Sequence, residues 1–221
     1  MIHLSFSPPK DVAVAVSGGC DSMAVLDFLR RSSRNVTALH FNHGTPNADA
    51  YERLVEKYCA EHKIPLITGV LDDVPDDGAS LEDFWRRERY AFFKEAHGLL
   101  PVITCHHLDD VAETWLFTSL HGTPRLIPAA RGVYLRPFLE TRKAVFEDWC
   151  DRKGVPYIED PSNNDTRFMR NFIRHEMIPK ALRVNPGLHK VLRKKIQQRA
   201  AEHTQQTGFE PEWILSNYEA T

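Results

Sequence analysis

The chain has 221 residues, of which 42% are hydrophobic and 26% charged, and it carries a net charge of −2. At roughly 100–200 residues per domain, this length suits one α/β domain with an appendage. No stretch approaches the ~20 apolar residues of a membrane span, and the N-terminus lacks the apolar segment of a secretory signal. We therefore predict a cytoplasmic protein without a membrane partner. The four cysteines form no C-x-x-C pair, so we expect reduced thiols rather than a zinc ribbon or a redox motif.

The charge is distributed unevenly along the chain. Residues 167–199 hold ten lysines or arginines and one acid, Glu176, which gives this segment a net charge of +9 and the rest of the chain −11. A solvated helix face is one explanation for such a run. An electrostatic footprint for a polyanion such as RNA is the other.

Short apolar runs that predict buried strands alternate with segments of helical periodicity along the chain. Met23, Leu26 and Leu29 follow the first run at the spacing of a helix face buried in the core. The predicted strands span 12–16, 35–44, 64–71, 101–105 and 155–158. A first predicted helix follows Gly18 and Gly19, and the other predicted helices span 48–63, Ser80 as a cap to about 95, 109–121 and 141–153. This alternation predicts an α/β fold, a doubly wound parallel sheet with helices on both faces.

We assign residues 1–160 to that domain and residues 161–221 to a basic helical C-terminal extension that faces RNA. The first predicted strand runs directly into the turn Ser-Gly-Gly-Cys-Asp-Ser. Gly18 and Gly19 let backbone N–H groups approach an anion, and the following helix adds partial positive charge at its N-terminus. The hydroxyls of Ser17 and Ser22 are further donors. The turn therefore predicts a phosphate cradle, although it lacks the lysine and the spacing of a Walker loop.

Acidic and histidine side chains gather after the fourth predicted strand. Asp110 and Glu113 are three residues apart on a helix, so they project from one face near the carboxyl edge of the sheet, which suits an ammonium group. Acids at this spacing are also common on solvated surfaces, but the flanking His106, His107 and Asp109 favour a binding site. Adjacent residues of a strand point to opposite faces, so a transition-metal site at the two histidines is disfavoured.

Basic residues at two further places suit RNA phosphates and base edges. Arg86 and Arg89 are three apart on a predicted helix, where a salt bridge to the acidic loop 72–77 is the alternative. The second group, in the basic segment, consists of Arg170, Asn171 and Arg174. At the end of the second strand, His40, Asn42 and His43 suit a contact to adenine or ribose, and structural roles in the core are equally consistent with their positions.

Several motifs together resemble those of one family. S-G-G-C-D-S after a strand resembles the PP-loop of the ATP pyrophosphatase superfamily, and TCHHLDDVAET at 104–114 resembles the H-H-x-D-D-x-x-E-T signature of tRNA(Ile)-lysidine synthetases. EDFWRRERY at 82–90, RPFLETR at 136–142 and EDPSNNDTRFMRNFIRHEMIP at 159–179 agree with that family in order and spacing. The resemblance covers residues 12 to about 185 and implies an adenine nucleotide alpha hydrolase-like, Rossmann-like fold.

The resemblance implies that ATP adenylates the wobble cytidine of tRNA(Ile) with a CAU anticodon. Free L-lysine then displaces AMP to give lysidine. It implies that Ser17, Gly18, Gly19, Cys20 and Ser22 hold ATP, that Asp21 binds Mg²⁺, and that Asp21, Asp110 and Glu113 are catalytic. The substrates, lysine and the anticodon arm of the tRNA, would meet His106, His107, Asp109, Asp110, Glu113, Arg86, Arg89, Arg170, Asn171 and Arg174.

The chain also departs from the family pattern. Thr45-Pro46 stands where Leu-Arg is usual, and His121-Gly122-Thr123-Pro124 replaces R-G-[ST]-G, so two expected basic residues are absent. We expect a short form without the usual C-terminal domains. Three alternatives remain open: a PP-loop enzyme that modifies another RNA base, one that uses another nucleophile, and a non-catalytic nucleotide- or RNA-binding module. A homodimer also remains open.

Overall fold

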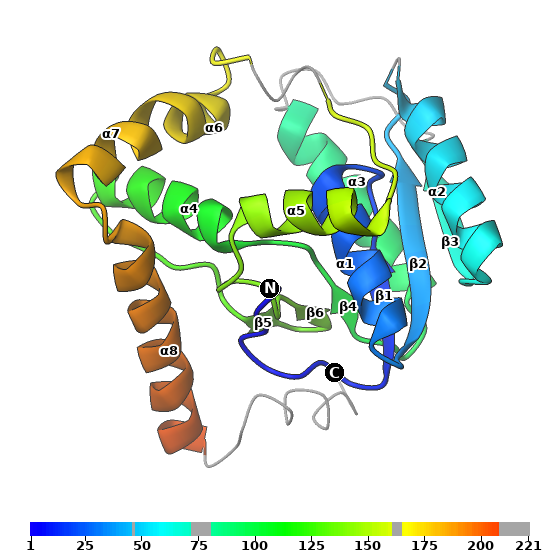
Figure 1. Cartoon of the computed structure of the whole chain (residues 1–221), viewed down its shortest axis with the longest axis horizontal. Helices are drawn as coiled ribbons and strands as arrows, with labels where there is room; N and C mark the ends of the chain where they lie inside the picture. The colour runs from blue at the N-terminus through cyan, green and yellow to red at the C-terminus, as the bar shows by residue number, and fades with distance from the viewer. Residues whose placement is uncertain (46, 72–80, 161–164, 208–221) are drawn as a thin grey trace. The chain divides into compact units, whose positions relative to one another are not determined.

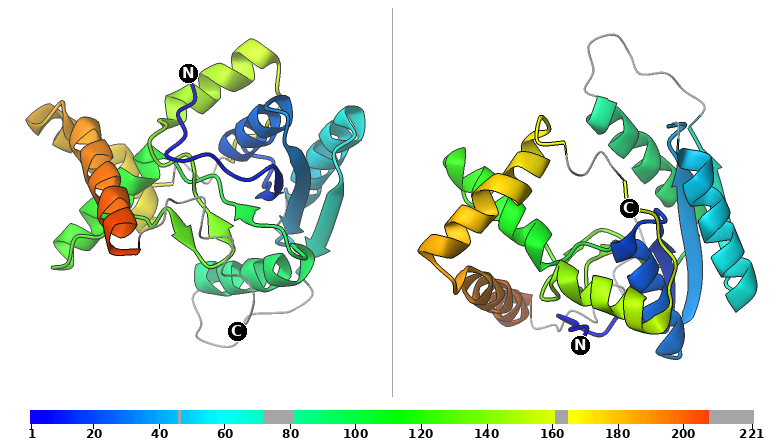
Figure 2. Two further views of the ribbon diagram at one scale, coloured as in Figure 1. Left: turned by 90° about the horizontal axis from the view of Figure 1, so that it is seen from below. Right: turned by 45° about the horizontal axis from the view of Figure 1, so that its top comes forward.

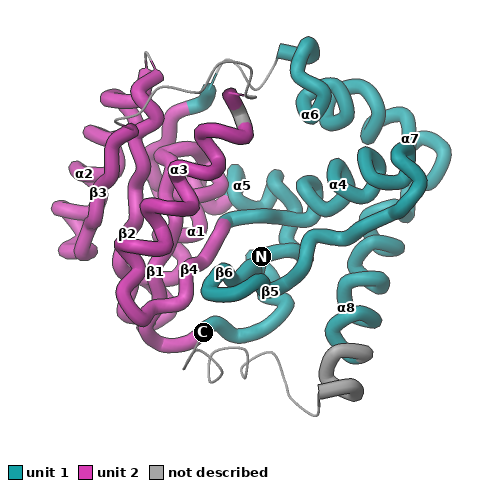
Figure 3. The backbone as a smooth tube through the Cα atoms, turned by 180° about the vertical axis from the view of Figure 1, so that it is seen from behind, with its two compact units in different colours: residues 1–8, 105–148, 159–221 teal, residues 9–104, 149–158 magenta. Residues whose placement is uncertain are grey.

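The structure, a computed structural model, describes residues 1–45, 47–71, 81–160 and 165–207 (Figure 1). It forms two compact units, each built from separate stretches of the chain (Figure 3). Unit 1 comprises residues 1–8, 105–148 and 159–221, and unit 2 comprises residues 9–104 and 149–158. The predicted division at residue 160 stays a prediction.

Four parallel strands form the sheet of unit 2, in the order β3-β2-β1-β4. Apolar side chains dominate its centre because a parallel sheet is buried on both faces, and Val12 and Val14 of β1 are fully buried. The register pairs Val12 with Val36 and Val14 with Ile103. The strands are β1 (Asp11–Ala15), β2 (Asn35–Asn42), β3 (Leu66–Val70) and β4 (Val102–Ile103).

Helices cover both faces of this sheet. Within unit 2, α1 and α2 lie on one face and α3 on the other (Figure 2), as the connection of β3 back to β4 requires. The bounds are α1 (Cys20–Arg31), α2 (Ala48–His62) and α3 (Leu81–Ala96). Met23, Leu26 and Leu29 are fully buried, as their spacing predicted. The doubly wound parallel α/β fold is therefore confirmed.

A fully buried carboxylate, Asp27 of α1, joins three helices of unit 2. It accepts hydrogen bonds from the hydroxyl of Tyr58 on α2 at 2.6 Å and from the indole N–H of Trp149 at 2.9 Å. Arg31, one turn further along α1, donates to it at 2.8 Å. Burial disfavours the charge on Asp27, but the donors Tyr58, Arg31 and Trp149 outweigh burial and lower its pKa. Asp27 therefore remains ionised inside the fold.

We expect Asp27→Asn to lower the free energy of unfolding by about 3 kcal/mol. The substitution removes the charge from a buried ion pair, and the amide nitrogen of asparagine cannot accept hydrogen bonds from the donors around it. The wild-type contribution is present at neutral pH and is lost as pH falls through the lowered pKa of Asp27. Urea unfolding at pH 7 and in acid measures both effects. Asp151→Asn, which changes an exposed acid on helix α5 (Lys143–Lys153), is the control and should be nearly neutral. Equal losses in the two variants would contradict a structural role for the Asp27 network.

Unit 1 is mainly helical. Its strands β5 (Ala130–Arg131) and β6 (Tyr134–Leu135) form an antiparallel pair. An apolar cluster that includes Leu108, Val111, Ile173, Leu192 and Ile196 joins its helices. The helices are α4 (Leu108–Leu120), α5 (Lys143–Lys153), α6 (Met169–Phe172), the π-helical turn η2 (Ile173–Met177), α7 (Ile178–Val184) and α8 (Leu188–Thr207). The last residues of α5 belong to unit 2.

Two details differ from the sequence-based expectations. The predicted strand at 155–158 is wrong, because these residues join no sheet in the described chain. Instead, the N–H of Ile158 donates a hydrogen bond to the carbonyl oxygen of Gly18 at 3.0 Å. The fourth strand is also shorter than predicted and covers Val102–Ile103 alone. The Ser80 cap and the loop 72–77 lie outside the described residues. Among the described helices, none is long and apolar enough to cross a membrane.

Candidate active site

The turn between β1 and α1 is held by its own serine hydroxyls. Ser22 Oγ accepts a hydrogen bond from the N–H of Ser17 at 3.1 Å and donates one to the carbonyl oxygen of Gly19 at 2.9 Å. The two serine hydroxyls lie 3.2 Å apart. Ser22 is buried whereas Ser17 is exposed. Ser22 therefore fixes the shape of the turn, and the exposed Ser17 accepts a hydrogen bond from the N–H of Gly19 at 3.3 Å.

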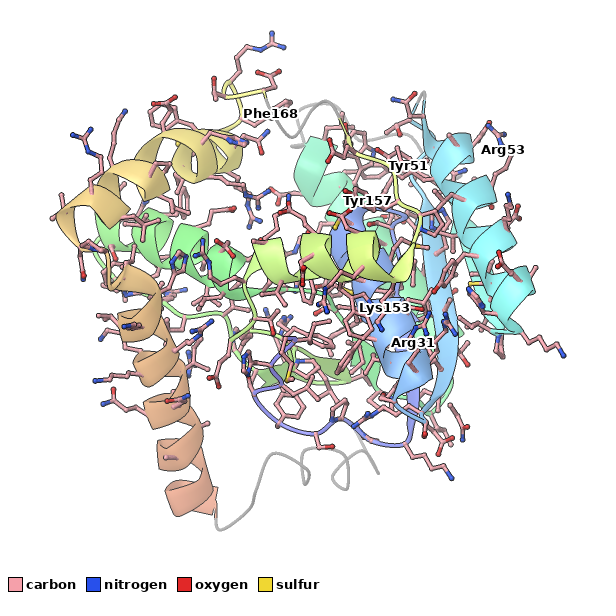
Figure 4. All side chains as sticks on the ribbon, viewed as in Figure 1. Arg31, Tyr51, Arg53, Lys153, Tyr157 and Phe168 are labelled. Carbon is pink, nitrogen blue, oxygen red and sulfur yellow. The ribbon has the colours of Figure 1, made fainter. Side chains whose placement is uncertain are left out.

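Gly18 is required by the geometry of this turn. Gly18 has a φ of +87°, and a Cβ there would lie 3.0 Å from a ring carbon of Tyr51 on α2 (Figure 4). Gly19 is the N-cap of α1 and is followed by Cys20 and Asp21 in the first helical turn. The first N–H groups of a helix have no partner within the helix and bear partial positive charge. The turn thus has the backbone of an anion-binding loop.

His40 and Asn42, at the end of β2, are buried and hydrogen-bonded within unit 2. The Nδ1–H of His40 donates to the carbonyl oxygen of Val16 at 2.8 Å, the residue before the turn. Its Nε2 has no partner among the described residues and is an acceptor in the neutral ring. The amide of Asn42 donates to Glu52 at 2.6 Å. Asn42 thus supports the fold, whereas His40 also retains a hydrogen-bonding atom.

An aromatic cluster lies beside these residues. The ring of His43 contacts the rings of Phe41 and Trp85, with centroids 4.9 and 5.9 Å away. Burial, aided by the charges of Arg89 and His40, lowers the pKa of His43 to about 4, so His43 is neutral at pH 7. The sequence analysis placed His43 beside the nucleotide, and that contact stays a prediction. It did not select Trp85, and the density of aromatic and histidine residues around 41–43 and 85 is the signal that could have found it.

The predicted RNA-binding arginines of α3 contact aromatic rings. Arg86 and Arg89 lie over the ring of Tyr90, with their guanidinium carbons 5.6 and 6.0 Å from its centroid. Arg89 is close enough to His43 to influence its pKa. Arg89 therefore lies beside the end of β2, and its predicted contact to RNA stays a prediction.

In unit 1, His107 and Asp110 form a capping box at the start of α4. The N–H of Asp110 donates to His107 Nδ1 at 3.4 Å, and Asp110 Oδ2 accepts from the N–H of His107 at 2.9 Å. Two otherwise unpaired helix donors are satisfied in this way. The buried His107 thus orients Asp110. His106, the residue before His107, is half-buried.

The pair Asp110 and Glu113 lies against two arginines. Arg174 of η2 donates to Asp110 Oδ1 at 3.2 Å and to Glu113 Oε2 at 2.8 Å, and Arg170 lies 3.6 Å from Glu113 Oε1. The structure thereby brings together four predicted site residues. The arginines, which were predicted to contact RNA, form ion pairs with the two carboxylates. Pro179 follows η2 and has no N–H to donate, which favours an irregular turn where Arg174 lies.

The two carboxylates differ electrostatically. Burial raises the pKa of Glu113, against the opposing charge of Arg174. Burial also opposes ionisation of Asp110, but its electrostatic interactions with His107 and His106 outweigh burial and lower the pKa of Asp110. The pKa of Glu113 is therefore shifted upwards and that of Asp110 downwards, a division typical of acid–base sites.

Asp109 and Asn171 have structural contacts. Asp109 accepts from the N–H of Lys143 at 2.8 Å, lies 3.4 Å from His189 Nε2, and its pKa is held well below the usual range because hydrogen bonds outweigh its burial. Asn171 donates to the carbonyl oxygen of Asp165 at 3.0 Å. His189, far along the chain, gave no local signal that it would pair with Asp109. The predicted substrate contacts of Asp109 and Asn171 stay predictions.

Comparison with known proteins identifies the family. Residues 3–181 match the family described as the PP-loop domain. The chain belongs to the PP-loop domain family. This confirms the resemblance inferred from the motifs, and ATP is the nucleotide that this family uses.

The chain is also similar to curated enzymes. The tRNA(Ile)-lysidine synthase of Thermotoga sp. strain RQ2 is 37% identical over 80% of this PP-loop chain and 46% of its own length. The tRNA(Ile)-lysidine synthase of Geobacter sulfurreducens is 37% identical over 84% of this chain and 43% of its own length. That of Enterococcus faecalis is 31% identical over 94% of this chain and 48% of its own length. The chain spans about half the length of the curated relatives it matches.

The turn of this PP-loop domain fits the phosphates of ATP. Its backbone comes close to Tyr51 at Gly18, where a side chain would be crowded, and the N-terminus of α1 opens at Gly19. A carboxylate beside an anion site is unfavourable unless a cation lies between them, so Asp21 suits Mg²⁺, which prefers oxygen ligands. Within the described residues, no three His, Cys, Asp or Glu side chains converge as a ready-made metal site.

Proposed function

We propose that this chain converts the wobble cytidine of tRNA(Ile) with a CAU anticodon to lysidine, using ATP and L-lysine in the cytoplasm. The observation that carries the proposal is the mixed-charge cluster of Asp110, Glu113, Arg170 and Arg174 in a PP-loop protein. Relatives named tRNA(Ile)-lysidine synthase support the same assignment.

In the first half-reaction, the C2 oxygen of cytidine attacks the α-phosphorus of ATP. The bond between the α-phosphorus and the bridging oxygen breaks, and pyrophosphate leaves. The N–H groups at Gly18, Gly19 and the start of α1 would bind the phosphates, with the hydroxyl of Ser17 as a further donor. Asp21 would hold Mg²⁺, which supplies neutralisation of the phosphate charge when bound.

In the second half-reaction, the ε-amine of lysine attacks C2, and AMP leaves with the oxygen that it activated. Free lysine carries both an α-carboxylate and ammonium groups. The arginines Arg170 and Arg174 suit its carboxylate, whereas Asp110 suits an ammonium group. The attacking amine must lose a proton, and Glu113, whose pKa burial raises, is suited to accept it. A cluster with charges of both signs therefore favours an amino acid over a simple cation.

The RNA would supply the third partner. Arg86 and Arg89 lie on α3, and the residues from Arg167 to Arg199 contribute most of the positive charge of unit 1. These groups suit the phosphates of the anticodon arm, and the resulting affinity would fall as salt rises.

We expect AMP and pyrophosphate to be the stoichiometric products of ATP, and their release to require both RNA and the intact Asp21. The protein is incubated with ATP, lysine and a tRNA(Ile) transcript, the nucleotides are separated, and the RNA is digested for mass spectrometry of lysidine. Arginine in place of lysine is the control for the nucleophile. Release of ADP and phosphate, or a modified base without lysine, would refute the proposal.

A further inference from the structure

A hollow of about 590 Å³ lies in unit 1 between α8 and the segment after α4, apart from the carboxylate cluster. The wall contributed by α4 and the following segment includes one large aromatic ring, two prolines and an arginine. The wall contributed by α8 is polar and basic. The lining residues are Trp115, Pro124, Arg125, Leu126, Pro128, Lys195, Gln198 and Arg199.

The contacts of α8 explain why these cations face the hollow. Leu192 and Ile196 are buried in the apolar cluster of unit 1 and fix the inner face of the helix. On one flank, the side chains of Arg193 and Gln197 are held by Glu140, at 3.0 and 2.8 Å. Lys195, Gln198 and Arg199 share the opposite flank because positions three and four apart are neighbours on a helix.

The charge of the hollow is uncompensated. Among its described lining residues, Arg125, Lys195 and Arg199 are cations and none is an acid. Within the described chain, neither Arg125 nor Lys195 forms an ion pair, and the guanidinium of Arg199 donates to the carbonyl oxygen of Leu126 at 3.3 Å. Three cations around one hollow repel each other, so an anion bound there would relieve that repulsion.

The aromatic wall identifies the kind of anion. Trp115 is half-buried and packs against the apolar cluster, which holds its indole in place beside the cations. A fixed aromatic ring next to positive charges can stack a nucleobase while the cations bind its phosphates. An acidic peptide would use the charges but gain less from the indole. The combination therefore favours a nucleotide within RNA.

We propose that this hollow binds one nucleotide of the RNA substrate, with its base on Trp115 and its phosphates on Arg125, Lys195 and Arg199. This inference rests on the proposed function for the choice of RNA. Trp115 is two residues beyond Glu113 on α4, so their side chains leave different faces of that helix. The bound nucleotide is therefore a neighbour of the modified cytidine in the RNA, and it anchors the chain while another base reacts.

The test uses two double variants of equal charge change on the full chain. Arg125→Gln with Lys195→Gln alters the hollow, whereas Lys10→Gln with Lys57→Gln alters exposed lysines of unit 2 that do not line it. Binding of a labelled anticodon stem-loop is measured by fluorescence anisotropy over a range of salt. The hollow variant should weaken binding about tenfold or more and lower the salt slope by about 2, roughly 1 per lost phosphate contact. The control variant should change both much less.

Intrinsic tryptophan fluorescence gives a second readout. RNA should quench the wild-type protein, and Trp115→Phe should lose most of that quenching although Trp85, Trp149 and Trp213 remain. These measurements need neither ATP nor lysine, so they stand even if no lysidine forms, and a failed modification assay would refute the proposed function alone. Equal weakening by both double variants, competition by polyglutamate as strong as by RNA, or equal quenching by ATP alone would each overturn the inference.

Discussion

Asp21→Asn is expected to lower the turnover number by about 10²–10³-fold, the range found when one electrostatic contact to a developing charge is removed. Asp21 lies in the first turn of α1, directly after the anion-binding turn. Its carboxylate can serve there only with a cation that neutralises the leaving pyrophosphate. Affinity for ATP should fall less, because most of the lost stabilisation belongs to the transition state. Pyrophosphate release at varied ATP gives kcat and KM separately.

Asp49→Asn is the matched control for this variant. Asp49 stands in the first turn of α2, as Asp21 stands in the first turn of α1, but it is exposed and follows no glycine turn. Its replacement should leave turnover nearly unchanged. An Asp21→Asn protein that keeps wild-type turnover would show that the carboxylate takes no part in ATP cleavage.

Asp110→Asn and Glu113→Gln are expected to impair lysine use strongly while adenylation of the RNA stays detectable. Both changes keep the shape of the side chain and remove its charge, so an ammonium group loses its counter-charge and the amine loses its proton acceptor. The two half-reactions are separated by trapping adenylated RNA without lysine and then adding lysine. Equal loss of both steps would mean that these carboxylates serve ATP or the metal instead.

The pH dependence distinguishes a chemical role of Glu113 from a structural one. Because burial raises its pKa, Glu113 takes up a proton at a higher pH than an ordinary glutamate as the solution is acidified. Lysine use by the wild type should therefore fall through that raised pKa, and Glu113→Gln should lack this fall. Asp110 is also part of the capping box, so Asp110→Asn is expected to lower the free energy of unfolding by about 1 kcal/mol. Its stability must therefore be measured beside its activity.

The sequence predicted the local features of the fold because they depend on neighbouring residues. An apolar run, a glycine pair and an apolar helical face define β1, the turn and α1 within twenty residues. The carboxylates on α4 were predicted from their spacing together with the flanking His106, His107 and Asp109. Arg174 was assigned to RNA, because nothing local indicates that η2 places it on Asp110 and Glu113, more than sixty residues earlier.

Other contacts depended on the tertiary structure in the same way. His107 was expected to meet substrate, but its side chain caps α4, a role that histidine fills rarely enough that residue type does not suggest it. The segment 155–158 has the composition of a strand, yet Ile158 gives its N–H to the turn at Gly18. Whether an apolar segment joins a sheet or stabilises a loop depends on whether a sheet edge lies next to it in the tertiary structure. The composition of the segment does not indicate this.

Unit 2 is built from two separate stretches of the chain, and this affects the order in which its parts can fold during synthesis. Its first stretch, residues 9–104, leaves the ribosome well before residues 149–158. Until that second stretch arrives, Asp27 lacks the indole of Trp149 and the carbonyl of Gly18 lacks the N–H of Ile158. The turn between β1 and α1, encoded near the start of the chain, is therefore expected to be completed late in synthesis, after the helix that carries the carboxylates has already been made.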